Sequence, residues 1–158
     1  MARRDITMSP AEVLEFLEAG RTLIVTTQGP DGWPHVAPMW YAVRDGKVVF
    51  RSFTKSQKIV NLQRDPRLIV LLETGDAYAE LRGVMIKGTA TLIEHAARVL
   101  EMYGELSGRY AFAGTEPVQL EGAALEEAFG RFASKNTGVI VEPKKVISWD
   151  HTKLGGGY

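Results

Sequence analysis

Two strand-forming runs meet at Asp45-Gly46 and lead directly into a basic helix start, and this segment constrains the fold more than any other. Residues 33–43 and 47–53 flank the Asp-Gly pair, which is typical of a two-residue hairpin turn. The second run continues into residues 54–62, where hydroxyl and lysine side chains open a short helical pattern. A helix N-terminus presents unpaired backbone N–H groups and a partial positive charge. We therefore predict a hairpin followed by a phosphate-binding corner.

The composition is that of an ordinary globular protein. The chain has 158 residues, of which 45% are hydrophobic and 24% charged, and its formal net charge is zero, which disfavours disorder and general nucleic-acid binding. The absence of cysteine excludes disulfides and thiolate chemistry. Uncharged apolar runs such as residues 68–72 are much shorter than the roughly 20 residues of a membrane-spanning helix. We expect one domain over residues 1–158, in the cytoplasm because no secretory signal pattern follows the first residues.

Capping and stop signals place the first helices. Ser9 and Glu12 form a capping box with Pro10 at the first helical position, which predicts a helix over about residues 10–19 that ends at Gly20. The helix after Thr54 should last only about two turns, because Asp65-Pro66 stops it.

The remaining elements follow from hydrophobic periodicity. We predict strands over residues 22–27 and 68–72, one long kinked strand over 78–93 interrupted at Gly83 and Gly88, helices over 95–107 and 123–132, and a last strand over about 139–149. Pro143 suits an edge or bulge of that last strand. The glycine-rich residues 108–122 suit a surface loop that covers a site, and residues 153–158 a flexible tail.

Mostly antiparallel strands with peripheral helices predict a mainly β fold, a small barrel, with parallel α/β winding as the weaker alternative. Neither of the common glycine-rich nucleotide-binding loops is present. His35, His95 and His151 lie far apart in the sequence, so we expect no metal site. No nucleophile elbow or catalytic pair of carboxylates is visible, and we assign no catalytic residue.

Residues 54–58 are the first candidate for ligand binding. The hydroxyl of Thr54 or Ser56 and the first-turn N–H groups can bind phosphate oxygens, while Lys55 and Lys58 supply positive charge. An ordinary capped surface helix with solvated lysines is an alternative of about equal weight. Cations in a first turn oppose the helix dipole, which favours a bound anion.

The second candidate is the segment Pro38-Met39-Trp40-Tyr41. It can offer an apolar, aromatic wall for a planar ring, with backbone amides beside the polar edge of that ring. Taken alone, such a run is better explained as core or subunit interface. The neighbouring phosphate motif favours the ring-binding interpretation.

Several short segments, each weak alone, together carry a specific resemblance. They are Gly32-Trp33-Pro34-His35-Val36, Pro38-Met39-Trp40-Tyr41, Asp45-Gly46, Lys55-Ser56-Gln57-Lys58, Asn61-Leu62, Arg64-Asp65-Pro66-Arg67 and residues 83–88, with a further match at 148–154. With these segments the chain resembles the pyridoxamine 5'-phosphate oxidase-like split β-barrel family, and within it the flavin/deazaflavin oxidoreductases common in actinobacteria. The similarity is strongest over residues 11–93.

The resemblance implies an FMN-binding split β-barrel and a homodimer whose two cofactor sites lie at the subunit interface. Each site would hold FMN or the deazaflavin coenzyme F420. By position, Ser56 and Lys58 match the phosphate-binding serine and lysine of the family, and Ser52 matches its strand-end hydroxyl. We add Lys55 to the cofactor-binding residues because of its charge and proximity.

The resemblance also places the cofactor ring. Pro38, Met39 and Trp40 match the segment along the ring, and Trp149 matches a late aromatic residue that reaches the neighbouring site. The expected activity is hydride transfer from reduced coenzyme F420 to an unsaturated or electron-poor small organic substrate. The alternatives are an FMN-dependent oxidoreductase or flavin reductase of the same fold, and a non-catalytic flavin- or haem-binding protein.

Three positions depart from the oxidase pattern of the family. Arg51 stands in place of the usual tyrosine, Gln57 in place of a basic residue, and Gly83 in place of a ring-contacting glutamine. These departures disfavour true pyridoxamine phosphate oxidation.

Overall fold

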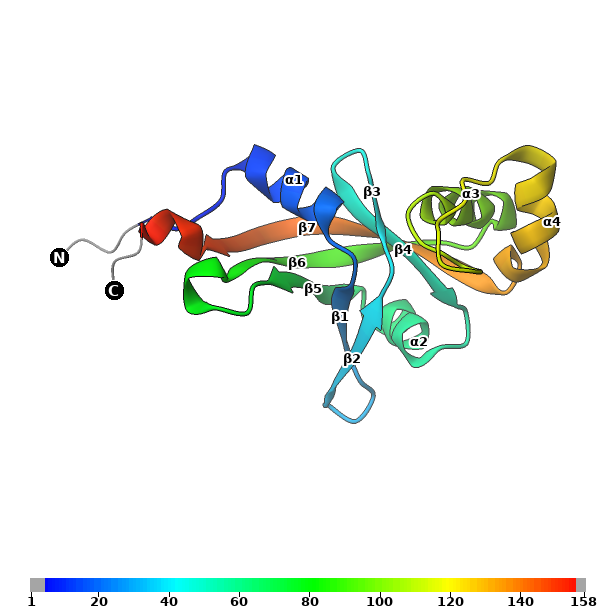
Figure 1. Cartoon of the computed structure of the whole chain (residues 1–158). Coiled ribbons are helices and arrows are strands. Elements are labelled where there is room, and N and C mark those ends of the chain that lie inside the picture. Colours follow the sequence, from blue (N-terminus) through cyan, green and yellow to red (C-terminus); the bar gives the residue numbers. More distant parts are fainter. Residues whose placement is uncertain (1–4, 156–158) are drawn as a thin grey trace.

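The structure, a computed structural model, describes residues 5–155 (Figure 1). Its elements are α1 (Pro10–Ala19), β1 (Leu23–Gln28), β2 (Pro34–Met39), β3 (Ala42–Arg44), β4 (Lys47–Phe53), α2 (Gln57–Arg64), β5 (Arg67–Thr74), the 3-10 helix η1 (Tyr78–Glu80), β6 (Arg82–Ile93), α3 (Ala96–Ser107), α4 (Gly122–Ala133), β7 (Asn136–Asp150) and the 3-10 helix η2 (His151–Leu154). The predicted flexible tail begins within η2 and continues into residues 156–158, which lie outside the described part of the chain.

Seven antiparallel strands form one curled sheet in the order β2-β1-β5-β6-β7-β4-β3. Figure 1 shows the long strands β6 and β7 running through the molecule, with α3 and α4 packed together at one end. α2 packs beside β1, and α1 lies close to β3 and β6. This arrangement confirms the predicted mainly β class with peripheral helices and agrees with a split β-barrel.

Side chains alternate along β4, so this strand faces two different apolar clusters. Phe50 is fully buried in the main core, together with residues of β1, β5, β6, β7 and the first two helices. Val49 faces a second cluster that includes Leu106 of α3. Because successive strand residues point to opposite faces, Arg51 lies on the α3 face of β4 and Ser52 on the main-core face.

Helix α1 begins with the predicted capping box. The Ser9 hydroxyl accepts a hydrogen bond from the Glu12 amide at 3.2 Å, and the Glu12 carboxylate accepts one from the Ser9 amide at 2.6 Å. The helix ends before Gly20 as predicted, but Gly20 has φ −69°, an ordinary value for any residue. Glycine is required there by packing, because a Cβ atom would collide with Leu72 and the Tyr41 hydroxyl.

The prediction of one strand over residues 33–43 is wrong at its centre. The run divides into β2, which pairs with β1, and β3, which pairs with β4 at the other end of the sheet. The division falls at Trp40 and Tyr41. Tyr41 is fully buried, and its hydroxyl donates a 2.5 Å hydrogen bond to the carbonyl of Leu17, so tertiary packing turns the chain here.

The prediction of one strand over residues 78–93 is wrong for its first residues, which form η1 before β6 begins. The register of β6 against β7 shifts next to Gly88, which confirms a bulge there. Pro143 is the Cα partner of Gly88. It therefore lies beside the bulge, as predicted, and beyond Ile140, where the printed register of β7 with β4 ends.

The other helices form where the sequence places them. Asp65 ends α2 after two turns, and α3 and α4 begin within one residue of the predicted positions. None of the helices within residues 5–155 is long and apolar enough to cross a membrane. The same residues contain no cluster of three or more acidic or histidine side chains that could hold a metal ion.

Candidate functional site

Three polar side chains converge where β4 ends and α2 begins. The Ser52 hydroxyl lies 3.1 Å from the Ser56 hydroxyl and accepts a 3.3 Å hydrogen bond from the Lys58 ammonium group. A tight turn, closed by a 2.8 Å bond from the Ser56 amide to the Phe53 carbonyl, holds the strand end against the helix start. The structure therefore brings together three of the residues predicted from the sequence.

The cluster is rich in donors and has no acidic partner. Burial lowers the pKa of Lys58, and no carboxylate in the described part of the chain pairs with this lysine. The Ser56 side chain does not cap α2, and the amides of Gln57 and Lys58 have no acceptor among residues 5–155. Hydroxyls, an ammonium group and free first-turn amides can together hold an oxyanion.

Thr54 and Lys55 are not part of this convergence. The Thr54 hydroxyl lies 2.9 Å from the Thr137 hydroxyl of β7, and the Thr54 amide donates to the Lys135 carbonyl at 3.0 Å. Lys55 is exposed, and it makes no hydrogen bond or ion pair within the part of the chain that the structure describes. Within the described residues, neither side chain makes a hydrogen bond to Ser52, Ser56 or Lys58.

Pro38, Met39 and Trp40 line a pocket of about 290 Å³ together with Arg51 and Leu106. Met39 also packs against the main core. The interpretation of this segment as core therefore applies to the buried Tyr41 and in part to Met39, whereas Pro38 and Trp40 are exposed and available to a ligand.

Aromatic side chains from the segment after α3 support the Trp40 ring. Trp40 stacks on Tyr110 with centroids 4.7 Å apart and an angle of 11° between the planes, and it meets Phe112 edge-on at 5.3 Å. Both partners belong to the glycine-rich segment that the sequence predicts as a covering loop. Such offset and edge-on pairs fix ring orientation beyond what burial alone provides.

Trp149 lies far from these residues within one chain. It is 12 residues along β7 from Thr137, the Cα partner of Ser52, which corresponds to about 40 Å of extended strand. Its indole ring covers Gly83 of β6, where a Cβ atom would collide with the ring. Gly83 keeps a regular register with Trp149, so the strand has no bulge at this glycine.

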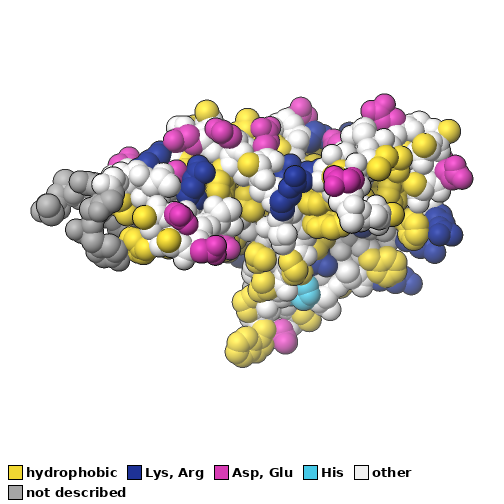
Figure 2. All heavy atoms as spheres, viewed as in Figure 1, with side chains coloured by type: hydrophobic (Ala, Val, Ile, Leu, Met, Phe, Trp, Pro, Cys, Tyr) yellow, Lys and Arg dark blue, Asp and Glu magenta, His cyan; other side chains and the backbone are white. Residues whose placement is uncertain are grey.

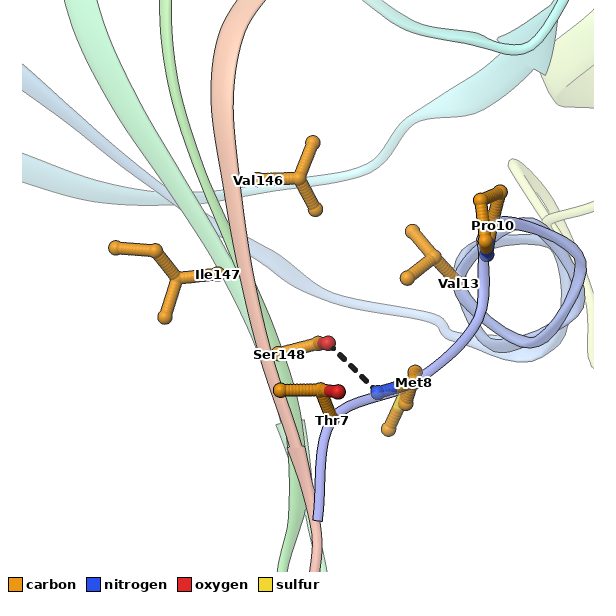
Figure 3. A pocket seen from close by; sticks show the side chains of 7 residues that line it. All are labelled: Thr7, Met8, Pro10, Val13, Val146, Ile147 and Ser148. Carbon is orange, nitrogen blue, oxygen red and sulfur yellow. Dashed lines mark hydrogen bonds between the residues drawn. The ribbon is translucent and has the colours of Figure 1, made fainter. Parts of the chain in front are cut away.

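An apolar groove of about 490 Å³ lies between the start of α1 and the end of β7 (Figure 3). Its lining comprises Thr7, Met8, Pro10, Val13, Val146, Ile147 and Ser148. The Ser148 hydroxyl accepts a 2.9 Å hydrogen bond from the Met8 amide across one side of it. With no ionisable group in this lining, the groove offers packing surface and no catalytic chemistry.

Residues 9–145 match the family described as pyridoxamine 5'-phosphate oxidase. The chain belongs to this family. Conserved hypothetical protein Rv2991 from Mycobacterium tuberculosis is 38% identical to this family member over 100% of this chain and 94% of that chain, with a TM-score of 0.87. No match was found among curated proteins.

More distant solved structures share the fold of this pyridoxamine 5'-phosphate oxidase family member. An F420 reductase is 23% identical over 84% of this chain and 94% of that chain, with a TM-score of 0.63. An FAD-binding protein from Mesorhizobium loti is 19% identical over 90% of this chain and 92% of that chain, with a TM-score of 0.62. At these identities the likeness concerns the fold, and it confirms the split-barrel expectation.

Four residues that line or support the pocket were not predicted as site residues from the sequence. They are Arg51, Leu106, Tyr110 and Phe112. One signal was available for Arg51. It follows three buried apolar residues of β4, where a charged side chain is unusual. No comparable signal marks Leu106 or the two aromatic residues, because only the packing of the α3 end against β4 brings them to Trp40.

Proposed function

We propose that this protein is an oxidoreductase in which reduced coenzyme F420 delivers a hydride to an unsaturated or electron-poor small organic molecule. The observation that carries the proposal is the convergence of Ser52, Ser56 and Lys58 at the start of α2. Family membership supports a cofactor-binding barrel, and the structural neighbours include an F420 reductase and an FAD-binding protein.

The residues present fit a cofactor that has a phosphate and a planar ring. The donor cluster at Ser52 and Lys58 suits phosphate oxygens, and the exposed faces of Pro38 and Trp40 suit a ring. The two parts flank β4, and the ribityl chain that separates ring from phosphate in both FMN and coenzyme F420 provides reach between them. When bound, the coenzyme supplies the hydride, and the protein supplies binding and orientation.

Each predicted residue has a defined task in this proposal. Ser52, Ser56 and Lys58 hold the phosphate, while Thr54 and Lys55 border it and the Lys55 charge raises the local concentration of anions. Pro38, Met39 and Trp40 hold the ring, and the loop that carries Tyr110 excludes water from one side of Trp40. The proposal needs no proton donor from the protein, because solvent can protonate the product.

A homodimer completes the site in this proposal. Trp149 is too far from Ser52 within one chain to share its ligand. A second copy that packs against the sheet can bring its own Trp149 to the site, which is the arrangement implied by the family resemblance. Trp149 then contacts the cofactor of the neighbouring subunit.

The test is a titration of cofactor-free protein with coenzyme F420 and with FMN, followed by the fluorescence of each ligand. We expect micromolar or tighter binding of F420 and weaker binding of FMN. Preference for FMN would replace the proposal with an FMN-dependent oxidoreductase of the same fold. Binding of neither would overturn cofactor-dependent reduction and leave a non-flavin binding protein.

Turnover tests the reaction separately from binding. Reduced F420 is mixed with the protein and a cyclic enone, and the return of oxidised F420 is followed by its fluorescence. We expect reoxidation that depends on both the protein and the enone. A protein that binds F420 but leaves the reduced form intact with activated alkenes would be a carrier rather than a reductase.

A further inference from the structure

The pocket beside Trp40 contains a cation that the proposed cofactor site does not use. Arg51 lines this pocket of about 290 Å³ together with Pro38, Met39, Trp40 and Leu106. The pocket lies on the α3 face of β4, whereas Ser52 and Lys58 lie on the main-core face. Arg51 therefore needs an explanation of its own.

The hydrogen-bonding capacity of Arg51 is largely unused. Its Nε atom is buried without a hydrogen-bond partner, and Nη1 makes one bond of 3.3 Å to the neutral Asn136 side chain. No carboxylate within residues 5–155 pairs with it, in contrast to Arg44 and Arg82, which pair with Glu105 and Asp150. A buried charge without a counter-ion is costly, so an unpaired guanidinium beside a pocket is unusual.

Aromatic rings hold this guanidinium in place. Its central carbon lies 4.1 Å from the centroid of the Tyr103 ring and 5.7 Å from that of Phe112. Burial lowers the pKa of Arg51, but an arginine side chain stays protonated in proteins. The rings attract the cation without satisfying its N–H donors as an oxygen acceptor does.

We propose that the pocket binds the carboxylate group of a small planar organic ligand, with Arg51 as the carboxylate receptor and the apolar body of the ligand beside Leu106, next to the cofactor ring that Pro38 and Trp40 hold. The planar fork of a guanidinium matches the two oxygens of a carboxylate. The pocket volume is at the low end for ligand sites, which suits a small acid rather than a whole cofactor.

Two ligands in these proposals carry a carboxylate group that Arg51 can bind. If the ligand is the hydride acceptor, its class is an unsaturated carboxylic acid, and this assignment rests on the proposed function. The glutamate tail of coenzyme F420 carries the same group. The recognition chemistry at Arg51 is identical in both cases, so the experiment has to separate them.

The first experiment compares cinnamate with cinnamamide, a neutral molecule of nearly the same shape, by calorimetric titration of the full chain with and without F420. We expect cinnamate to bind at least about tenfold more tightly, the ratio for one charge-assisted hydrogen bond. Equal binding of the two compounds, or binding of neither, in both conditions would overturn the proposal.

Substitutions then connect that preference to one side chain. Arg51→Gln should remove the preference for cinnamate, and Arg51→Lys should keep part of it. Arg131→Gln is the matched control, because Arg131 also lies over an aromatic ring, Phe132 at 4.8 Å, but is exposed. If Arg51→Gln still binds cinnamate more tightly than cinnamamide, Arg51 is not the carboxylate receptor. If this variant does not fold, the comparison of cinnamate with cinnamamide on the wild-type protein still tests the proposal.

Two further readings identify the source of the carboxylate. Substrate recognition leaves the F420 affinity of Arg51→Gln unchanged, and γ-glutamylglutamate does not displace cinnamate. Tail recognition weakens F420 binding in Arg51→Gln, and the dipeptide competes with cinnamate. Cinnamate preference without any F420 binding would refute the proposed function and leave the carboxylate site intact.

Discussion

Arg51 and Ser52 are adjacent in the sequence but have opposite surroundings, because β4 points them to different faces of the sheet. Ser52 joins Lys58 in a cluster of donors at the start of α2. Arg51 lies among aromatic rings below α3. One strand end thus carries two separate groups able to bind anions, and substitutions at the two positions should affect different ligands.

Replacement of Lys58 by alanine should weaken the binding of phosphate-bearing cofactors by about 1.5 to 3 kcal/mol, the range for hydrogen bonds to a charged group. Lys58 donates to Ser52 and is the half-buried cation of the cluster. Lys145→Ala, an exposed lysine of β7, is the control and should leave affinity unchanged. The measurement is the dissociation constant of F420 for each variant. Equal dissociation constants for Lys58→Ala and the control would show that Lys58 does not bind the phosphate.

Ionisation of Tyr41 should lower the free energy of unfolding in alkaline solution. Burial raises its pKa to about 12, against the lowering effect of Arg109, while the unfolded value is about 10. Above pH 10 the unfolded state releases this proton first, so the folded state binds more protons and the free energy of unfolding falls as pH rises. The loss approaches about 2 kcal/mol near pH 12.

Urea denaturation of wild type and Tyr41→Phe between about pH 9 and 11.5 measures this effect. The variant loses the hydrogen bond to the Leu17 carbonyl and is less stable at every pH. Its stability should nevertheless fall less steeply with pH than that of wild type. Parallel curves would show that Tyr41 does not control the alkaline limit.

At the scale of elements, the boundaries of helices and strands were predicted best where interactions between residues close in the sequence set them. The capping box at Ser9 starts α1, and Asp65-Pro66 ends α2, because both signals act within one turn of the chain. The break at Tyr41 was not predictable in this way. It depends on a buried contact with Leu17, 24 residues earlier in the chain.

The same distinction applies to the candidate site. Ser56 and Lys58 lie at the start of α2, so the pattern of a helix start was enough to predict them, whereas Ser52 was predicted from the family resemblance. The pocket residue Leu106 comes from α3, far away in the sequence, and only the packing of α3 on β4 brings it to Arg51. Local patterns therefore predicted the start of α2 and the Pro38-Met39-Trp40 side of the pocket, and they missed Arg51 and Leu106.

The contact between β6 and β7 at Gly83 should tolerate no side chain. A Cβ atom there would enter the space of the Trp149 ring, so Gly83→Ala should lower the free energy of unfolding by about 1 to 3 kcal/mol, the usual cost of overpacking. Lys87→Ala, at an exposed position of the same strand, should change it by less than about 0.5 kcal/mol. Urea denaturation provides these values.

A double-mutant cycle shows whether the indole is the cause. Gly83→Ala should cost clearly less in a Trp149→Ala background than in wild type, because the colliding ring is gone. The same cost in both backgrounds would place the strain in the β6 backbone and not in the contact with Trp149.

At the scale of the whole molecule, β2 leaves an apolar row exposed at one edge of the sheet. Val36 is 59% and Trp40 is 42% exposed, and Trp33 at the hairpin tip is 76% exposed. Figure 2 shows hydrophobic side chains gathered over the hairpin of β1 and β2. Pro34 and Pro38 lack N–H donors, so this edge is poorly suited to strand pairing and better suited to packing by side chains. We therefore expect a second copy of the chain to cover this row, in accordance with the proposed homodimer.

Val36→Lys should convert this dimer to a monomer, because it places a charge in the centre of the row that the second copy would bury. Light scattering coupled to size-exclusion chromatography measures the mass, with Val118→Lys as control, since Val118 is 62% exposed on the segment between α3 and α4. The monomer should also bind F420 more weakly, because in the proposed dimer Trp149 contacts the cofactor of the neighbouring subunit. If the wild-type protein is a monomer at micromolar concentration, or if Val36→Lys remains dimeric, this row is not the interface. If monomeric Val36→Lys binds F420 with full affinity, each chain forms its cofactor site alone.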